Sequence, residues 1–351
     1  MIKKRLISGL GVLILALVIC VGSFFQSKEY YASLEKKSVI EEVEEEDDNY
    51  FADVWLTYWG TGEAKAELDL VADSVHDICY FAAYYDEEGN PFVEDSTLKL
   101  FKEYSSDSRF NNKNYLTFVN DVRLNDGSAI SKDVALLEDF FKTDFSMQQC
   151  AKKMVELAVA EGFDGVEVDF EALGNEDEIW YSYVDFVTCL YQMTQERALD
   201  LRIVLEPSFR LKGFCWPDGP EYVVMCYNLH GKTTEAGDRA NKEFLLELVD
   251  KMEQMPGEPN FALATGGYDF KADGTVVGVT AKEAEELFMK TPGEAPMRDE
   301  NSGQLYFGYI DDEDLIHYVW YSDIDTIKYW MDVIKSTGHN NFTIFKVGGT
   351  L

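Results

Sequence analysis

Three acidic residues alternate with apolar residues near the middle of the chain: Glu167, Asp169 and Glu171, within the segment FDGVEVDFE at 163–171. We call these three acids the carboxylate ladder. Because side chains on a β-strand alternate between two faces, the three carboxyl groups would share one face. Partly buried carboxyl groups that lie close together cannot all ionise, so at least one should have a raised pKa. We expect Glu171 to keep its proton at neutral pH, which is the property that a general acid needs.

The flanking sequence predicts that the carboxylate ladder lies on an inward-facing barrel strand. Ser146 and Gln149 suggest a capping box ahead of a helix that Gly162 would end, and a second helical stretch covers 176–198. A strand between two helices is typical of a parallel α/β fold, where barrel enzymes place catalysis at the C-terminal ends of the strands. Glu171, the last acid of the ladder, is therefore the candidate catalytic acid. An antiparallel strand with its acids facing water fits this context less well.

Short β-rich stretches alternate with helical stretches over residues 50–351 and predict a (β/α)8 TIM barrel. The link between the seventh and eighth strands is too long for one helix, and we expect a small α+β insertion at about 268–320. Within it, 281–289 looks helical, and 304–310 and 315–320 look like strands. The sequence contains no G-x-G-x-x-G or Walker motif, which argues against nucleotide binding. The predicted barrel strands cover 54–58, 77–84, 115–119, 165–170, 201–205, 222–227, 261–265 and 342–347.

The N-terminal residues predict an export signal or a membrane anchor. Lys3, Lys4 and Arg5 precede an uncharged apolar run that ends at Phe25 and is long enough to cross the hydrocarbon core of a membrane. The basic cluster should stay in the cytoplasm, so the large domain would lie outside it. We expect residues 1–25 to be an uncleaved anchor, with a cleaved signal and a secreted protein as the alternative.

The formal net charge of the chain is −34, and residues 26–49 form an acidic polar linker that should be extended and solvated. Such an acidic surface repels nucleic acid, so we expect no nucleic-acid partner, and it is compatible with a neutral substrate. The histidines are dispersed in the sequence, at His76, His230, His317 and His339, so we expect no metal site and no cofactor. We also expect a monomer.

The acidic segment resembles the D-x-x-D-x-D-x-E signature of glycoside hydrolase family 18, the chitinase-like enzymes. Asp164, Asp169 and Glu171 match this signature, and Glu167 stands where the family has its second Asp. The resemblance covers nearly all of the chain after residue 50. It implies that Asp164 and Glu167 tune the charge of the ladder from below.

Two further segments extend the resemblance. Met225, Tyr227 and Asn228 are similar to the family's M-x-Y-D motif, with Asn228 in place of the Asp. Residues 317–323 and the last predicted strand resemble the C-terminal part of the bacterial spore-cortex and chitinase-like branch, with Phe345 in the place of a Trp under the reactive sugar. Both replacements keep part of the chemistry, because an amide still forms hydrogen bonds and a Phe ring still stacks.

The resemblance implies a mechanism in which the substrate's own 2-acetamido group is the nucleophile. Glu171 would protonate the glycosidic oxygen and later activate water, and Asp169 would stabilise the cationic intermediate. Tyr227 would hold the acetamido carbonyl oxygen for attack. The substrate would be a β-1,4-linked N-acetylglucosamine glycan, with chitin, peptidoglycan and the chitobiose core of N-glycans all open. The candidate substrate-binding residues are Asn228, Met225, Phe345, Trp55, Tyr58, Tyr84 and Glu206.

Two other classes of protein compete with a hydrolase. A non-catalytic chitinase-like protein could bind a glycan at the cell surface, but such proteins usually lack the catalytic Glu, whereas Glu171 is present here. A cell-surface scaffold has no support beyond the predicted anchor. The residues therefore favour an enzyme.

Overall fold

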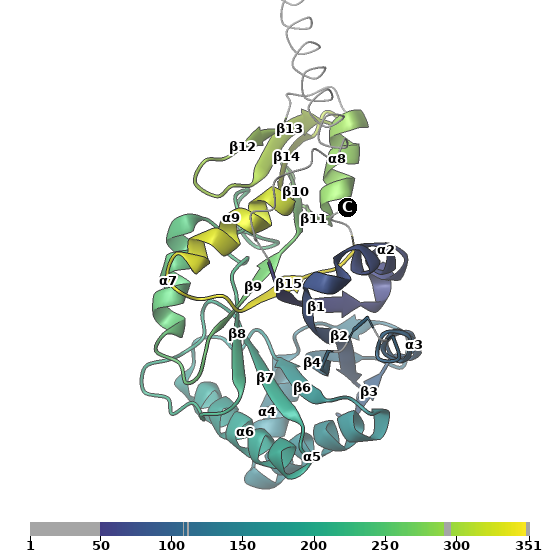
Figure 1. Ribbon diagram of the computed structural model, residues 1–351, viewed down its shortest axis with the longest axis vertical. Coiled ribbons are helices and arrows are strands. Elements are labelled where there is room, and N and C mark those ends of the chain that lie inside the picture. The colour runs from purple at the N-terminus through teal and green to yellow at the C-terminus, as the bar shows by residue number, and fades with distance from the viewer. Residues whose placement is uncertain (1–49, 108, 111, 291–295, 349–351) are drawn as a thin grey trace, which may run out of the picture.

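The computed structural model describes residues 50–107, 109–110, 112–290 and 296–348. Eight parallel strands form a closed barrel, in which each strand pairs with a parallel neighbour on either side (Figure 1). This arrangement confirms the predicted (β/α)8 TIM barrel. In order around the barrel, the strands are β1 (Ala52–Thr57), β2 (Val75–Tyr85), β4 (Asn114–Arg123), β6 (Gly165–Asp169), β7 (Asp200–Leu205), β8 (Glu221–Met225), β9 (Asn260–Ala264) and β15 (Phe342–Phe345), which pairs with β1.

Helices follow most of the barrel strands and cover the outside of the barrel (Figure 1). The link between β7 and β8, residues 206–220, is the exception, since it contains no helix. Two short strands, β3 (Pro91–Val93) and β5 (Ala129–Ile130), pair antiparallel with the C-terminal ends of β2 and β4. The helices around the barrel are η1 (Tyr58–Gly60), α2 (Thr61–Val71), η2 (Ala72–Ser74), α3 (Asp95–Tyr104), α4 (Val134–Phe141), α5 (Asp144–Glu161), α6 (Asp177–Glu196), α7 (Lys242–Met252) and α9 (Ile324–Lys335).

The helix ahead of β6 begins at a different cap from the predicted one. The Thr143 hydroxyl accepts a hydrogen bond from the backbone N–H of Ser146 at 3.0 Å, and the Ser146 hydroxyl accepts one from the N–H of Thr143 at 3.0 Å. This reciprocal capping box starts α5 at Asp144, so the predicted pairing of Ser146 with Gln149 is wrong. Gly162 ends the helix in the left-handed region, with φ 88°, as its sequence position predicts.

Strand β6 alternates between two environments, which is why its acids gather on one side. Val166, Val168 and Phe170 belong to the outer apolar core, together with buried side chains of α5 and α6. The Phe170 ring stacks on Phe186 of α6, with ring centroids 5.8 Å apart. Glu167 and the other acids of the ladder are left for the inner side of the strand, as the period of two requires.

An α+β insertion separates β9 from α9, as predicted. Its strands form an antiparallel sheet in the order β11-β10-β14-β13-β12, and α8 (Ala281–Lys290) packs on it through Ala284 and Phe288. Figure 1 shows the insertion on one side of the barrel, beyond β9 and β15. The strands of the insertion are β10 (Gly266–Lys271), β11 (Val276–Val279), β12 (Met297–Arg298), β13 (Leu305–Ile310) and β14 (Ile316–Ser322).

The predicted anchor at 1–25 and the predicted linker at 26–49 lie outside the described residues, and both stay predictions. Within the described part of the chain, no helix is long and apolar enough to cross a membrane.

Candidate active site

The lowest acid of the carboxylate ladder, Glu167, is an enclosed ion-pair partner inside the barrel. Its side chain is 0% exposed and accepts hydrogen bonds from Trp55 Nε1 at 2.6 Å, Thr117 Oγ1 at 2.7 Å and Arg202 Nε at 3.0 Å. Trp55 lies on β1, which is not a neighbour of β6, so the bond spans the barrel interior. Because both carboxylate oxygens have partners, the Glu167 side chain is held in place inside the barrel.

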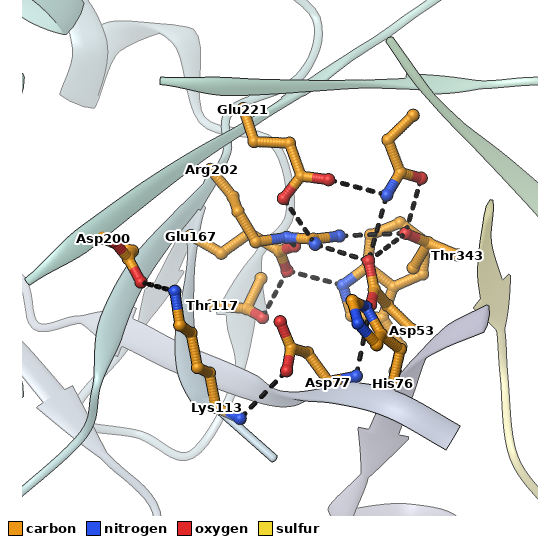
Figure 2. Close-up of polar contacts among 12 residues, drawn as sticks. Asp53, His76, Asp77, Lys113, Thr117, Glu167, Asp200, Arg202, Glu221 and Thr343 are labelled. Atoms are coloured by element: carbon orange, nitrogen blue, oxygen red, sulfur yellow. Dashed lines mark hydrogen bonds and ion pairs between the residues drawn. The ribbon is translucent and has the colours of Figure 1, made fainter. Parts of the chain in front are cut away.

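Arg202 joins several barrel strands beneath the ladder. Besides Glu167, its guanidinium group donates to Asp53 at 2.6 Å, Glu221 at 2.8 Å and Thr343 at 2.9 Å (Figure 2). Burial alone would raise the pKa of Asp53, but Arg202 holds it down at about 2. Paired charges therefore fill the N-terminal half of the barrel, and the upper acids of the ladder lie at its C-terminal end.

Asp169, the middle acid, is buried without a full set of partners. Within the described part of the chain, its Oδ1 atom has no hydrogen-bond partner. Burial, together with the charges of Glu171 and Glu167, raises the pKa of Asp169 well above its ordinary value of 3.8. A neutral carboxyl group suits this environment, so we infer that Asp169 as well as Glu171 can hold a proton of the ladder.

Two neighbouring side chains hold the backbone of Glu171, just beyond the C-terminal end of β6. Asn120 of β4 accepts a hydrogen bond from the Glu171 N–H at 2.9 Å and donates one to the Glu171 carbonyl oxygen at 3.0 Å. Glu206, at the end of β7, accepts one from the Ala172 N–H at 2.9 Å. The strands on both sides of β6 therefore fix the direction in which the Glu171 side chain points.

The Glu171 carboxyl group forms an ion pair with Lys132, which lies between β5 and α4. Burial raises the pKa of Glu171 and Lys132 opposes that rise, with a net shift upward. Sequence reasoning missed Lys132, because no local pattern links it to a residue 39 positions away. Asn120 could be noticed at a strand end, but its function as a backbone clamp depends on the pairing of β4 with β6.

An aromatic floor adjoins the two upper acids. Tyr227, just after β8, stacks on Phe345 of β15 with ring centroids 5.9 Å apart, and Phe345 meets Trp55 edge-on at 6.0 Å. Burial raises the pKa of Tyr227, and the charges of Asp169 and Glu171 raise it further, so its hydroxyl keeps its proton beside both acids. The structure thus brings together the three residues that the family resemblance assigns to catalysis.

The remaining predicted substrate-binding residues divide into buried and accessible ones. Trp55 and Tyr84 are each 2% exposed, so their rings pack inside the protein, and their part in substrate binding stays a prediction. Met225 is also buried in the barrel. Tyr58 is half-buried, and Asn228 is exposed, with its side-chain amide donating to the Met225 sulfur at 3.5 Å. Tyr58 and Asn228 therefore keep surface that a ligand could reach.

Asp164 lies at the opposite end of β6 from Glu171. It is exposed, and its carboxylate accepts hydrogen bonds from the backbone N–H of Asn114 at 2.9 Å and from the Asn114 side chain at 3.1 Å. Asp164 therefore joins the starts of β4 and β6, whereas the resemblance implied that it tunes the ladder directly.

His76 belongs to a group of three potential metal ligands, although the dispersed histidines predicted no metal site. The ligand atoms of Asp53, His76 and Asp77 lie within 4.8 Å of one another at the N-terminal end of the barrel. Asp53 is already bound there by Arg202 and by Asn260 at 3.0 Å, and His76 faces it at 3.4 Å. This group lies at the other end of the barrel from Glu171 and takes no part in the cleft.

The fold and the site together define a class of protein: a parallel (β/α)8 barrel in which a buried acid pair and an aromatic floor meet at the C-terminal strand ends. No protein-family model matches the chain. One curated relative, the uncharacterized glycosylase YvbX of Bacillus subtilis, is 24% identical over 217 residues, which cover 56% of this chain and 60% of that protein. The chain thus spans less than two thirds of the length of this relative.

Solved structures of chitinases and cortex-lytic enzymes share the fold. A chitinase from Chromobacterium violaceum superposes with a TM-score of 0.70 at 17% identity, over 86% of this chain and 95% of that one. The spore cortex-lytic enzyme SleL of Bacillus megaterium gives 0.68 at 14% identity, over 87% and 73%. A GH18 chitinase from Cycas revoluta in complex with (GlcNAc)3 gives 0.65 at 14% identity, over 85% and 95%. The resemblance predicted from the motifs is therefore confirmed in the fold.

Proposed function

We propose that this protein is a glycoside hydrolase that cleaves β-1,4-linked N-acetylglucosamine glycans by substrate-assisted, retaining catalysis. The observation that carries the proposal is the buried pair of Asp169 and Glu171 at the C-terminal end of β6, beside the hydroxyl group of Tyr227. Two adjacent acids in a desolvated site hold a proton between them, and a proton donor next to a second acid is what glycosidic cleavage requires.

Each residue then has one task in the proposed reaction. Glu171 gives its proton to the glycosidic oxygen as the acetamido carbonyl oxygen of the substrate attacks the anomeric carbon. Asp169, which becomes an anion when its proton passes to Glu171, stabilises the positive charge of the cyclic intermediate, and Tyr227 holds the acetamido oxygen in position. The Glu171 carboxylate then takes a proton from the water that opens the intermediate. Phe345 supplies the apolar surface under the reacting sugar.

The choice of glycan is part of the proposal. Chitinases and a spore cortex-lytic enzyme are both among the proteins that share the fold, which supports chitin and peptidoglycan as the first substrates to test. The chitobiose core of N-glycans is the third. The predicted N-terminal anchor would place the site outside the cytoplasm, where such polymers occur.

Replacement of Glu171 tests the proposed function. The purified chain should release oligosaccharides from at least one of chitin oligomers, peptidoglycan and a high-mannose glycopeptide. In Glu171→Gln, the rate should fall about a hundredfold to ten-thousandfold, because the amide cannot donate the catalytic proton. The matched control is Glu156→Gln, the same change at an exposed position of α5. Binding without turnover by the wild-type chain would favour the glycan-binding alternative and contradict the proposal.

A further inference from the structure

Lys132 is held in an unusual backbone position within reach of Glu171. Its φ angle is 54°, in the left-handed region that side chains other than glycine rarely adopt. Asp121 keeps it there by accepting a hydrogen bond from the Lys132 N–H at 2.8 Å. The neighbouring Asp133 N–H donates to the carbonyl oxygen of Asn120 at 2.7 Å. Backbone strain that is maintained in this way often marks a functional position.

The same residue, Asn120, anchors both partners of the ion pair. Its backbone carbonyl holds the Lys132 loop through Asp133, and its side-chain amide holds the Glu171 backbone. The Lys132 side chain is 48% exposed and the Glu171 side chain is 16% exposed. The ion pair therefore lies at the border between the barrel interior and solvent, with both backbones bound to Asn120 of β4.

Several charged and titratable groups face the Glu171 carboxyl group. Glu206, just after β7, and Asp121 of β4 are acidic, Asp169 of β6 lies close to it, and Tyr227 follows β8. Lys132, which contacts the same carboxyl group, is the positively charged member of this set in the described part of the chain. A lone ammonium group among acids should strongly favour the ionised carboxylate that it contacts.

We propose that Lys132 is a positioning residue that orients the Glu171 carboxyl group, favours its ionised form in the empty cleft, and so sets the pH range over which Glu171 can donate a proton. This inference rests on the proposed function of Glu171. When the O–H bond of Glu171 breaks and its proton passes to the leaving oxygen, the ammonium group of Lys132 stabilises the carboxylate that remains. Lys132 thus makes Glu171 a stronger acid, and it narrows the pH range of activity on the alkaline side.

The pH profile of the full chain tests this inference. The probe is the hexamer of N-acetylglucosamine, with kcat/KM measured across the alkaline limb, which reports the acid of the free enzyme. In Lys132→Met the alkaline limb should move to higher pH by about one pH unit, because the positive charge that favours the ionised carboxylate of Glu171 is removed. In Lys132→Arg, which keeps the charge, it should stay close to the wild-type position. The control Lys113→Met removes a lysine that pairs with Asp200 at the opposite end of the barrel.

Two outcomes of the profile would overturn the inference. A uniform loss of kcat/KM in Lys132→Met without a displaced limb would mean that the lysine is only structural. An equal displacement in Lys113→Met would mean that net charge, rather than contact with Glu171, moves the limb. Circular dichroism of each variant would show that the fold is retained.

A second readout needs no substrate and separates this inference from the proposed function. Carboxyl carbon NMR of chain labelled at glutamate Cδ can follow the titration of Glu171, identified by the signal that Glu171→Gln removes. The Glu171 signal should titrate at higher pH in Lys132→Met than in the wild type and Lys132→Arg. An unchanged titration overturns the inference even if the chain cleaves glycans. If the Glu171 signal titrates at higher pH in Lys132→Met but the wild-type chain cleaves no glycan, the result would support the inference about Lys132 and contradict the proposed function.

Discussion

Two acids that stand two positions apart on one strand have different environments. Asp169 is enclosed and has an oxygen without a partner in the described part of the chain, whereas Glu171 faces a lysine at the edge of the cleft. The pKa values of both are raised, with burial as the main cause, and that of Asp169 is raised well above its ordinary value. The two carboxyl groups can therefore hold a proton that passes from Asp169 to Glu171 in the proposed reaction.

The burial of Asp169 should lower stability at neutral pH. Its pKa is higher in the folded chain than in the unfolded chain, so the folded chain is favoured when Asp169 is protonated and loses this advantage as the pH rises above about 4. Asp169→Asn should therefore raise the melting temperature by a few degrees at pH 7 and by little at pH 4, while activity is lost. Thermal unfolding at both pH values checks this, with Asp250→Asn, on the exposed side of α7, as the control. A stabilisation that did not depend on pH would contradict it.

At the scale of the elements, β6 and the residues just after it carry three acids with three different tasks. The lowest is neutralised by Arg202, the middle one is buried as a neutral group, and the last is aimed by Asn120 and Glu206 from the strands on either side. The network around Arg202 also contacts side chains of β1, β6, β8 and β15 (Figure 2). A single guanidinium group thus holds together strands that are far apart in the sequence.

Removal of Arg202 should unfold the chain at much lower denaturant concentration. Arg202→Met leaves Glu167 and Asp53 buried without their cation, which typically costs about 3–5 kcal/mol in the free energy of unfolding. The control Arg109→Met removes an exposed arginine that pairs with Asp107, and it should have a much smaller effect. Urea unfolding followed by circular dichroism measures both.

The effect of Arg202→Met should also depend on pH. Because the folded pKa of Asp53 is about 2 against an ordinary 3.8, the stabilisation from its ion pair is present above pH 3.8 and is lost as the pH falls toward 2. The difference between variant and wild type should shrink over that range. If the difference in the free energy of unfolding stays constant over that pH range, the ion pair with Asp53 does not account for the stabilisation by Arg202.

At the scale of the whole molecule, the sequence predicted the parts of the architecture that depend on local periodicity. The eight strands, the end of α5 at Gly162 and the insertion after β9 all follow from the alternation of apolar residues and from turn residues. Each predicted strand overlaps an observed one, with differences at the ends. Strand ends are set by hydrogen bonds to neighbouring strands, which local sequence does not contain.

The contacts that complete the site could not be predicted in the same way. The bond between Arg202 and Asp53 joins residues 149 positions apart, and the pairs of Glu171 with Asn120 and Lys132 join residues from different loops and strands. The motif identified the acids themselves, because their spacing has a period of two. The spacing did not reveal that Asp164 lies at the opposite end of the strand from Glu171, or that the rings of Trp55 and Tyr84 are almost fully buried.

The anomeric form of the first product tests the central claim most directly. Proton NMR can follow the new reducing end during cleavage of the N-acetylglucosamine hexamer by the full chain, before the anomers equilibrate. The acetamido group attacks the face of the anomeric carbon opposite the leaving group, and water then attacks the face that the leaving group has vacated, so the β-anomer should form first. Early accumulation of the α-anomer, or no cleavage of any of the three glycans under conditions where the chain is folded, would contradict the assignment of Glu171 and Asp169 to substrate-assisted catalysis.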